Sequence, residues 1–164
     1  MKTNIDLTTI KIPDDQRSAD VMKPSMIVTF WLGTELFGVD IEWVQEMLRS
    51  QEITPIPLAP EYVAGLINLR GQIIMALHLK KLINNQTPAF NPNPDSMNLI
   101  VRHNEDVVSL LIDDVGDVLE LNPTDMRSVP PTLTTIKSEY LYGVYPLNTH
   151  LLLVLNMERV LTLQ

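Results

Sequence analysis

The sequence contains no cysteine, which excludes disulfide bridges and thiolate metal sites. It also lacks an apolar run that could cross a membrane, because the longest uncharged stretch, 140–157, is interrupted by glycine, proline and asparagine. The N-terminal segment has no apolar stretch of the kind that a secretory signal peptide carries. These absences fit a protein of the reducing cytosol that does not insert directly into a membrane.

Basic and aromatic residues are scarce as well. The net charge is −8 at pH 7, and aromatic residues make up 5% of the chain. An acidic chain repels phosphate backbones, and single-stranded nucleic acid is bound by aromatic residues on a basic groove. Nucleic acid is therefore excluded as a partner. The acids between 101 and 125 form either a solvated face or a surface that attracts a basic partner.

Motifs of catalysis, phosphate binding and metal binding are missing. The chain has no P-loop, GxGxxG, GxSxG or HExxH motif, and His78, His103 and His150 are scattered without metal-ligand spacing. Asp113 and Asp114 are adjacent in a predicted strand, so they should point to opposite faces and could not easily address one substrate. We therefore predict a protein that is not an enzyme, has no cofactor or metal, and works through contacts with other proteins.

The sequence does contain many short segments of β-branched and aromatic residues, separated by turn residues. This pattern predicts an all-β fold of barrel or sandwich type. In chain order we predict a flexible tail over 1–24, a hairpin over 26–43 turning at Gly33-Thr34-Glu35, a loop over 50–60, a strand over 71–79, a short helix over 79–85, a loop over 84–98, a hairpin over 99–115 turning at Asn104-Glu105-Asp106, more strand to Leu121, and a final strand and short helix.

The two halves of the chain resemble each other, over about 26–83 and 97–164. A shift of 78 residues places Glu61-Tyr62 on Glu139-Tyr140, Gly65 on Gly143, Ile74 on Leu152 and Leu77 on Leu155, and upstream the shift is 71. The repeat predicts two similar β units. Because a lone core of about 65 residues is marginal, the units should share a hydrophobic interface or exchange strands.

Arg70 interrupts this repeat. It lies within the apolar segment GLINLRGQIIMALHL (65–79), where an unpaired buried charge would be costly. Under the shift it falls on Asn148, so the second half keeps the apolar pattern without the arginine. This favours a functional role for Arg70 over one in which it satisfies carbonyls in a turn peculiar to the first half. Gly71 fits a turn that needs a positive φ or a close backbone approach.

Two further positions are weaker candidates. Glu46 falls on Asp117 under the shift of 71, so an acid recurs there, and a solvated strand position is as compatible with the sequence as a functional one. Val44 falls on Val115, and a place in the core is favoured over contact with a partner.

The segment YVAGLINLRGQIIMALHLKKLI resembles the signature of the CheW family, the coupling proteins of bacterial chemosensory arrays. FGVDIEWVQEM, LLIDDVGDVLEL and YLYGVYPLNTHLLLVLNMERVL resemble further family segments, so the resemblance covers 26–162. It implies that 25–164 is a CheW-like domain of two SH3-like five-stranded β-barrels, packed on a shared hydrophobic interface, with short helices. It also implies a non-enzymatic cytoplasmic adaptor without a cofactor. Such an adaptor bridges the tip of a chemoreceptor to the regulatory domain of a CheA-type histidine kinase and is recruited to membrane-associated receptor arrays.

The resemblance assigns receptor contact to Val44, Glu46 and Arg70, and leaves the kinase-binding residues unknown. Two positions depart from the family signature: Met75 stands where the family has proline, and His78 stands where it has aspartate. They leave open whether the chain serves a flagellar or a type IV pilus system.

Two alternatives remain at this stage. One is an orphan small-barrel binding module unrelated to chemoreceptors. The other is an enzyme that uses the region of Asp113 and Asp114.

Overall fold

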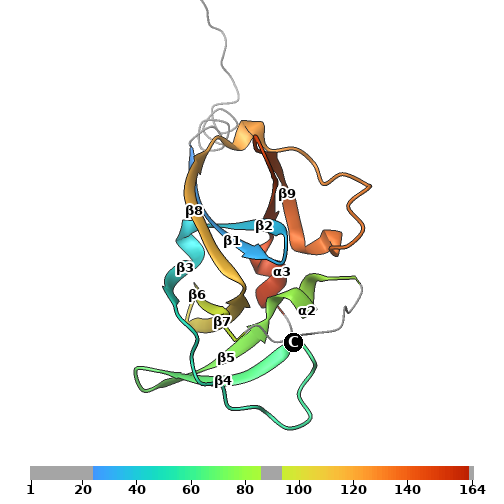
Figure 1. The fold of residues 1–164 in the computed structure, drawn as a ribbon. Helices are drawn as coiled ribbons and strands as arrows, with labels where there is room; N and C mark the ends of the chain where they lie inside the picture. Colours follow the sequence, from blue (N-terminus) through green and yellow to red (C-terminus); the bar gives the residue numbers. More distant parts are fainter. Residues whose placement is uncertain (1–23, 86–93, 163–164) are drawn as a thin grey trace, which may run out of the picture.

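The computed structural model describes residues 24–85 and 94–162, which form ten β-strands and a few short helices (Figure 1). Apart from Pro24, the predicted flexible tail lies outside the described residues, as do residues 86–93 of the predicted loop over 84–98. The elements are β1 (Ser25–Leu32), β2 (Glu35–Asp40), η1 (Ile41–Trp43), β3 (Val44–Leu48), β4 (Val63–Leu69), β5 (Gln72–His78), α2 (Leu79–Ile83), β6 (Met97–His103), β7 (Asp106–Ile112), β8 (Asp114–Leu121), η2 (Pro123–Asp125), η3 (Ser138–Tyr140), β9 (Leu141–Pro146), β10 (Leu151–Leu155) and α3 (Met157–Leu161).

The turns lie where the local sequence predicts them. Gly33, at φ 62°, and Thr34 join β1 to β2, and Asn104, at φ 57°, and Glu105 join β6 to β7. Glycine and asparagine are the residues that adopt this left-handed conformation most readily, so the hairpins follow from local chemistry. The short helix after β5 and the final strand and helix are confirmed as well.

The strands form two sheets, each of five strands, that exchange elements between the halves of the chain. The order is β8-β1-β2-β10-β9 in one sheet, which we call barrel A, and β3-β6-β7-β5-β4 in the other, barrel B. Each barrel takes two strands from one half and three from the other. The exchange of strands, one of the two arrangements that the repeat allowed, is therefore present, and neither barrel coincides with one half of the repeat.

The repeat is visible in the register of the two sheets. Leu153 pairs with Phe37 in the parallel pair of β10 and β2, and Met75 pairs with Val108 in the parallel pair of β5 and β7. These are the pairings that the shifts of 78 and 71 residues predict. The same arithmetic thus holds for local segments and for contacts between the halves.

Gly65 and Gly143 have a shared structural cause. At each glycine the preceding loop crosses the strand, through isolated bridges of Thr54 with β4 and of Arg127 with β9. A Cβ at either glycine would collide with the backbone carbonyl oxygen of Thr54 or Arg127. The matching glycines in the repeat are required by this close approach of backbone to backbone.

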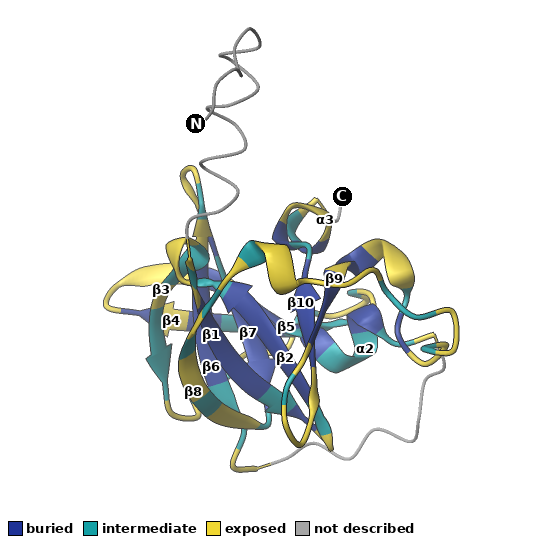
Figure 2. Cartoon of the chain, turned by 90° about the horizontal axis from the view of Figure 1, so that it is seen from above, coloured by how far each residue is buried: buried dark blue, intermediate teal, exposed yellow. Residues whose placement is uncertain are grey.

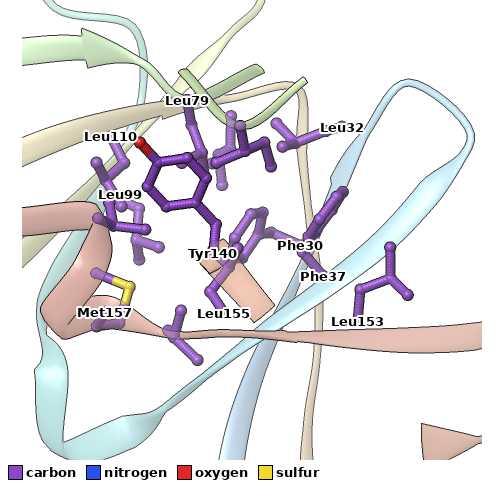
Figure 3. Close-up of a cluster of buried hydrophobic side chains, with 14 of the residues drawn as sticks. Phe30, Leu32, Phe37, Leu79, Leu99, Leu110, Tyr140, Leu153, Leu155 and Met157 are labelled. Carbon is purple, nitrogen blue, oxygen red and sulfur yellow. The ribbon is translucent and has the colours of Figure 1, made fainter. Parts of the chain in front are cut away.

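The hydrophobic core has three parts. A central cluster lies between the barrels and takes side chains from both sheets, among them Phe30, Phe37, Leu99, Leu110 and Leu153 (Figure 3). The other two clusters fill the barrels: Ile67, Leu69, Ile74, Ala76, Ile100 and Val107 lie inside barrel B, and Ile27, Leu36, Tyr145, Leu152 and Val154 lie inside barrel A. The predicted all-β fold with a shared hydrophobic interface is confirmed. Figure 2 shows the inner strands buried and much of β8 exposed.

Candidate functional site

The β4–β5 hairpin reverses through Arg70 and Gly71. Their φ angles are 52° and 88°, and a two-residue turn with both values positive has the geometry of a type I′ hairpin. Asn68 Oδ1 accepts a hydrogen bond from the Gly71 backbone N–H at 2.8 Å and closes the turn. No atom lies near the place where a Cβ on Gly71 would point. Of the two explanations for this glycine, the positive φ is therefore the correct one.

Arg70 forms a two-point ion pair with Glu46. Its Nη1 donates to Glu46 Oε2 at 2.8 Å and its Nη2 donates to Glu46 Oε1 at 2.7 Å. These hydrogen bonds lower the pKa of the Glu46 carboxyl and raise the pKa of the guanidinium. The side chain of Arg70 is still 67% exposed, and three of its five N–H groups remain outside the pair. Arg70 thus holds a carboxylate and keeps donors available to a partner.

This ion pair joins the two edge strands of barrel B. Glu46 lies on β3 and Arg70 follows β4, and these strands are at opposite ends of the sheet order. In barrel A the corresponding positions are Asp117 and Asn148, and an asparagine cannot form an ion pair. The side-chain bridge across the barrel seam is therefore specific to barrel B. Because the pair is exposed, it contributes little to stability.

A β-bulge in β3 separates Glu46 from Val44. Val44 pairs with Val101, which belongs to the central cluster, whereas Glu46 pairs with Ile100, which belongs to the interior of barrel B. In a regular strand Val44 and Glu46 would share a face, but the extra residue at Gln45 turns them to opposite faces. The structure thus brings Glu46 to Arg70 and leaves Val44, half-buried, packed against the central cluster.

Several exposed apolar side chains were not assigned a role from the sequence. Met26 on β1, and Val115 and Val118 on β8, lie at the uncovered edge of the face of barrel A that carries the central cluster. η1 packs against β1 and exposes Ile41, just before Val44. We call Met26, Ile41, Val44, Val115 and Val118 the rim surface, because they surround the contact between the barrels.

A signal for part of this surface was present in the repeat. Val115 and Val118 fall on Val44 and Met47 under the shift of 71 residues. The sequence analysis considered a partner contact only for Val44. Exposure of the second copy depends on how the barrels pack, which the sequence pattern does not contain.

The carboxylates of Asp113 and Asp114 are occupied by backbone groups. Asp113 lies between β7 and β8, so its predicted position within a strand is wrong, and its Oδ2 accepts from the Gly33 backbone N–H at 2.5 Å. Asp114 Oδ1 accepts from the Val115 backbone N–H at 2.8 Å. These contacts are structural, and they give no support to acid–base chemistry here.

The histidines are dispersed, as their spacing predicted. The rings of His103 and Trp43 stack at 5.0 Å, and those of His150 and Trp31 meet edge-on at 4.8 Å. His78 is half-buried at the end of β5. Across 24–85 and 94–162, no three histidine or acidic side chains are grouped in a way that could hold a metal ion. No helix in this part of the chain has the length and apolarity needed to cross a membrane.

The comparisons with known proteins agree with this geometry. The family model described as CheW-like domain matches residues 26–164. The chain is 33% identical over 136 residues to the chemotaxis protein CheW of Treponema pallidum, covering 82% of this chain and 80% of that protein. It is 31% identical over 133 residues to the chemotaxis protein CheW of Klebsiella aerogenes, covering 81% and 79%.

A solved structure has the same architecture. The crystal structure of the scaffolding protein TtCheW from Thermoanaerobacter tengcongensis matches with a TM-score of 0.72 and 32% identity, covering 81% of this chain and 89% of that chain. This likeness confirms the predicted pair of SH3-like barrels.

Proposed function

The chain belongs to the CheW-like domain family, and from this premise we propose that its two barrels join a chemoreceptor to a CheA-type histidine kinase by binding both. As a member of this family it is an adaptor of chemotaxis signal transduction. We propose further that it acts without catalysis and in the cytoplasm, recruited to membrane-associated receptor arrays. Direct contact with nucleic acid or insertion into the membrane forms no part of this function.

The observation that carries the proposal is the Glu46–Arg70 pair. Two residues from distant parts of the chain meet on the surface of barrel B, although an exposed ion pair adds little to stability. The arginine also occupies a positive-φ position that most residues avoid. A charged group that the fold does not need, held in a fixed orientation with free donors, is suited to recognition of a carboxylate or a carbonyl on a partner.

We assign the receptor contact to Arg70, Glu46 and Val44. Arg70 supplies the donors and Glu46 orients the guanidinium. Val44 belongs to the rim surface, whose exposed side chains match the apolar face of an amphipathic helix. A receptor tip built of helices would thus meet an apolar strip and an oriented guanidinium on one protein.

Reversal of charge at position 70 tests this assignment. We expect Arg70→Glu to change the free energy of unfolding by no more than about 0.5 kcal/mol, because the side chain is exposed. Binding of a helical-hairpin receptor fragment should weaken by about 2 kcal/mol or more, because Arg70 would be an interface anchor. Binding of the kinase regulatory domain should persist. Arg127→Glu, an exposed arginine on the barrel A side, is the matched control.

The exchange variant Glu46→Arg/Arg70→Glu separates contact from bridging. It restores an ion pair across the seam but moves the guanidinium to β3, so it should remain defective in receptor binding. Full rescue would mean that the bridge, and not the arginine, is what the receptor needs. An Arg70→Glu protein that binds the receptor normally, or that unfolds, would overturn the assignment. If the wild-type protein binds neither partner, the orphan binding module becomes the better interpretation.

A further inference from the structure

The outer face of the β4–β5 hairpin is apolar and open. Leu66 and Asn68 on β4 pair with Met75 and Ile73 on β5, and Met75 pairs with Val108 on β7. The side chain positions of Ile73 and Met75 are 58% and 41% exposed, and Leu66 and Val108 are half-buried. None of the five residues is charged. We call these five residues the hairpin face.

The equivalent face of barrel A is closed. There Val144 pairs with Leu153, which pairs with Phe37, in the positions that Leu66, Met75 and Val108 occupy in barrel B. Val144 and Leu153 are each only 2% exposed, and Phe37 and Leu153 both lie inside the central cluster (Figure 3). The same surface of the same fold is thus packed in one barrel and unpacked in the other.

The two loops that precede β4 and β9 account for part of this difference. The loop between β8 and β9 places Val129, Leu133 and Ile136 on the central cluster. The loop between β3 and β4 is shorter, and none of its residues belongs to that cluster. Its Leu58 is fully exposed at φ 63°. Barrel B therefore lacks the cover that its sister barrel takes from its own chain.

Met75 makes this face a feature of the present chain. The CheW signature that the sequence resembles has proline at this position. Proline would remove one N–H from β5, which is an inner strand of its sheet, and would offer a short rigid side chain. Methionine restores the N–H and adds a long, adaptable apolar side chain on the outer surface. The substitution increases the apolar area that a partner could cover.

The hairpin face and Val44 lie on opposite sides of the contact between the barrels. A single cross-strand row runs Leu66–Met75–Val108–Val101–Val44 through all five strands of barrel B. Val101, near its middle, is fully buried in the central cluster. A protein bound at the rim surface therefore leaves the hairpin face free for a second partner.

We propose that the hairpin face docks an uncharged apolar patch on the regulatory domain of the kinase. This inference rests on the proposed function, in which an adaptor must bind two partners at once and the receptor takes Arg70 and the rim surface. A flat strand face without charge fits the surface of a folded domain, because nothing on it would pair with the polar side of an isolated helix. The buried counterpart in barrel A shows that apolar protein surface packs on this face.

Charge insertion on the full-length chain tests the proposal. Ile73→Glu and Met75→Glu should each weaken binding of the kinase regulatory domain by about ten-fold or more, measured by calorimetry, because each would bury a carboxylate in an apolar interface. Receptor-fragment binding should change by less than about two-fold, since surface changes outside an interface have small effects. Leu151→Glu is the matched control, because Leu151 is the equivalent of Ile73 in barrel A and is 38% exposed.

Two further measurements sharpen the result. Wild-type kinase binding should change little between about 50 and 300 mM NaCl, because no charge on this face is screened. If either glutamate variant fails to fold, Ile73→Thr and Met75→Gln remove apolar surface without adding charge and should give the same loss in smaller measure.

The outcomes separate this inference from the proposed function. Folded variants that bind the kinase normally would overturn the inference and leave the adaptor role intact. Loss of receptor binding with kinase binding preserved would also overturn it. A wild-type protein that does not bind the kinase at all would overturn both.

Discussion

Arg70 and Leu58 hold backbone conformations that their residue types seldom adopt, at φ 52° and φ 63°. At Arg70 the conformation is needed by the two-residue turn, and Asn148 in the second half is the residue type that would adopt it more readily. A local choice that works against intrinsic preference is expected where function overrides stability. The side chain, and not the backbone, explains why arginine stands there.

His78 couples stability to pH. Burial, and to a smaller extent Lys81, lowers its pKa below the ordinary value near 6.5. The unfolded chain therefore binds a proton more readily than the folded one, and stability must fall as the pH drops below about 6.5 towards the folded pKa. We expect His78→Asn to flatten this dependence of the unfolding free energy, measured by urea titration between about pH 5.5 and 7.

Lys81→Gln provides the comparison for this measurement. It removes only the smaller cause of the pKa shift, so the slope should decrease less than in His78→Asn. A slope that His78→Asn leaves unchanged would show that other groups carry the pH dependence.

At the scale of elements, the β6–β7 pair hides a polar contact inside barrel B. Asn98 Nδ2 donates to Ser109 Oγ at 2.8 Å, and both residues are fully buried. Among the described residues no group donates to Asn98 Oδ1. The equivalent positions of barrel A are Ile27 and Gly38, which pack directly against each other. One barrel thus solves with hydrocarbon what the other solves with a hydrogen bond.

This contrast predicts a non-additive pair of substitutions. Ser109→Ala alone should cost about 1–3 kcal/mol, because it leaves the buried amide of Asn98 without its partner. Asn98→Val/Ser109→Ala should be at least as stable as the wild type, because both polar groups and the unsatisfied oxygen are removed together. Urea unfolding of the single and double variants measures the coupling. Equal costs that simply add would contradict the prediction.

For the whole molecule, the exchange of strands should make folding a single event. Each barrel needs strands from both halves, so neither half can complete a barrel alone. Ile74 lies inside barrel B and Leu152 inside barrel A, and both are buried. We expect Ile74→Ala and Leu152→Ala each to lower stability by about 2–5 kcal/mol within one cooperative transition.

Ile73→Ala is the control for this measurement, because the neighbouring side chain points to the outer face and is exposed. Two separated transitions, one sensitive to each core substitution, would show that the barrels unfold independently. A neutral effect at either buried position would contradict its place in the core.

The sequence alone was sufficient for the local structure. Gly33, Asn104 and Gly71 mark the hairpin turns because few other residues tolerate positive φ there. The apolar spacing marks the strands, and the repeat predicts which positions are equivalent. The absence of Arg70 from the second half marked it as a residue that the fold does not require. All of these follow from sterics and periodicity within short segments or from comparison of two segments.

Tertiary structure alone decided which residues meet. The repeat allowed a shared interface, exchanged strands or both, and only the packing of the whole chain shows both. The bulge at Gln45 sends Glu46 to Arg70 and turns Val44 away, although their spacing predicted a common face. The exposure of Met75, against burial of its equivalent Leu153, depends on loops that differ between the halves. Such contacts depend on the summed free energy of long-range pairing, in which a shift of one residue reverses every face, and no short segment contains that information.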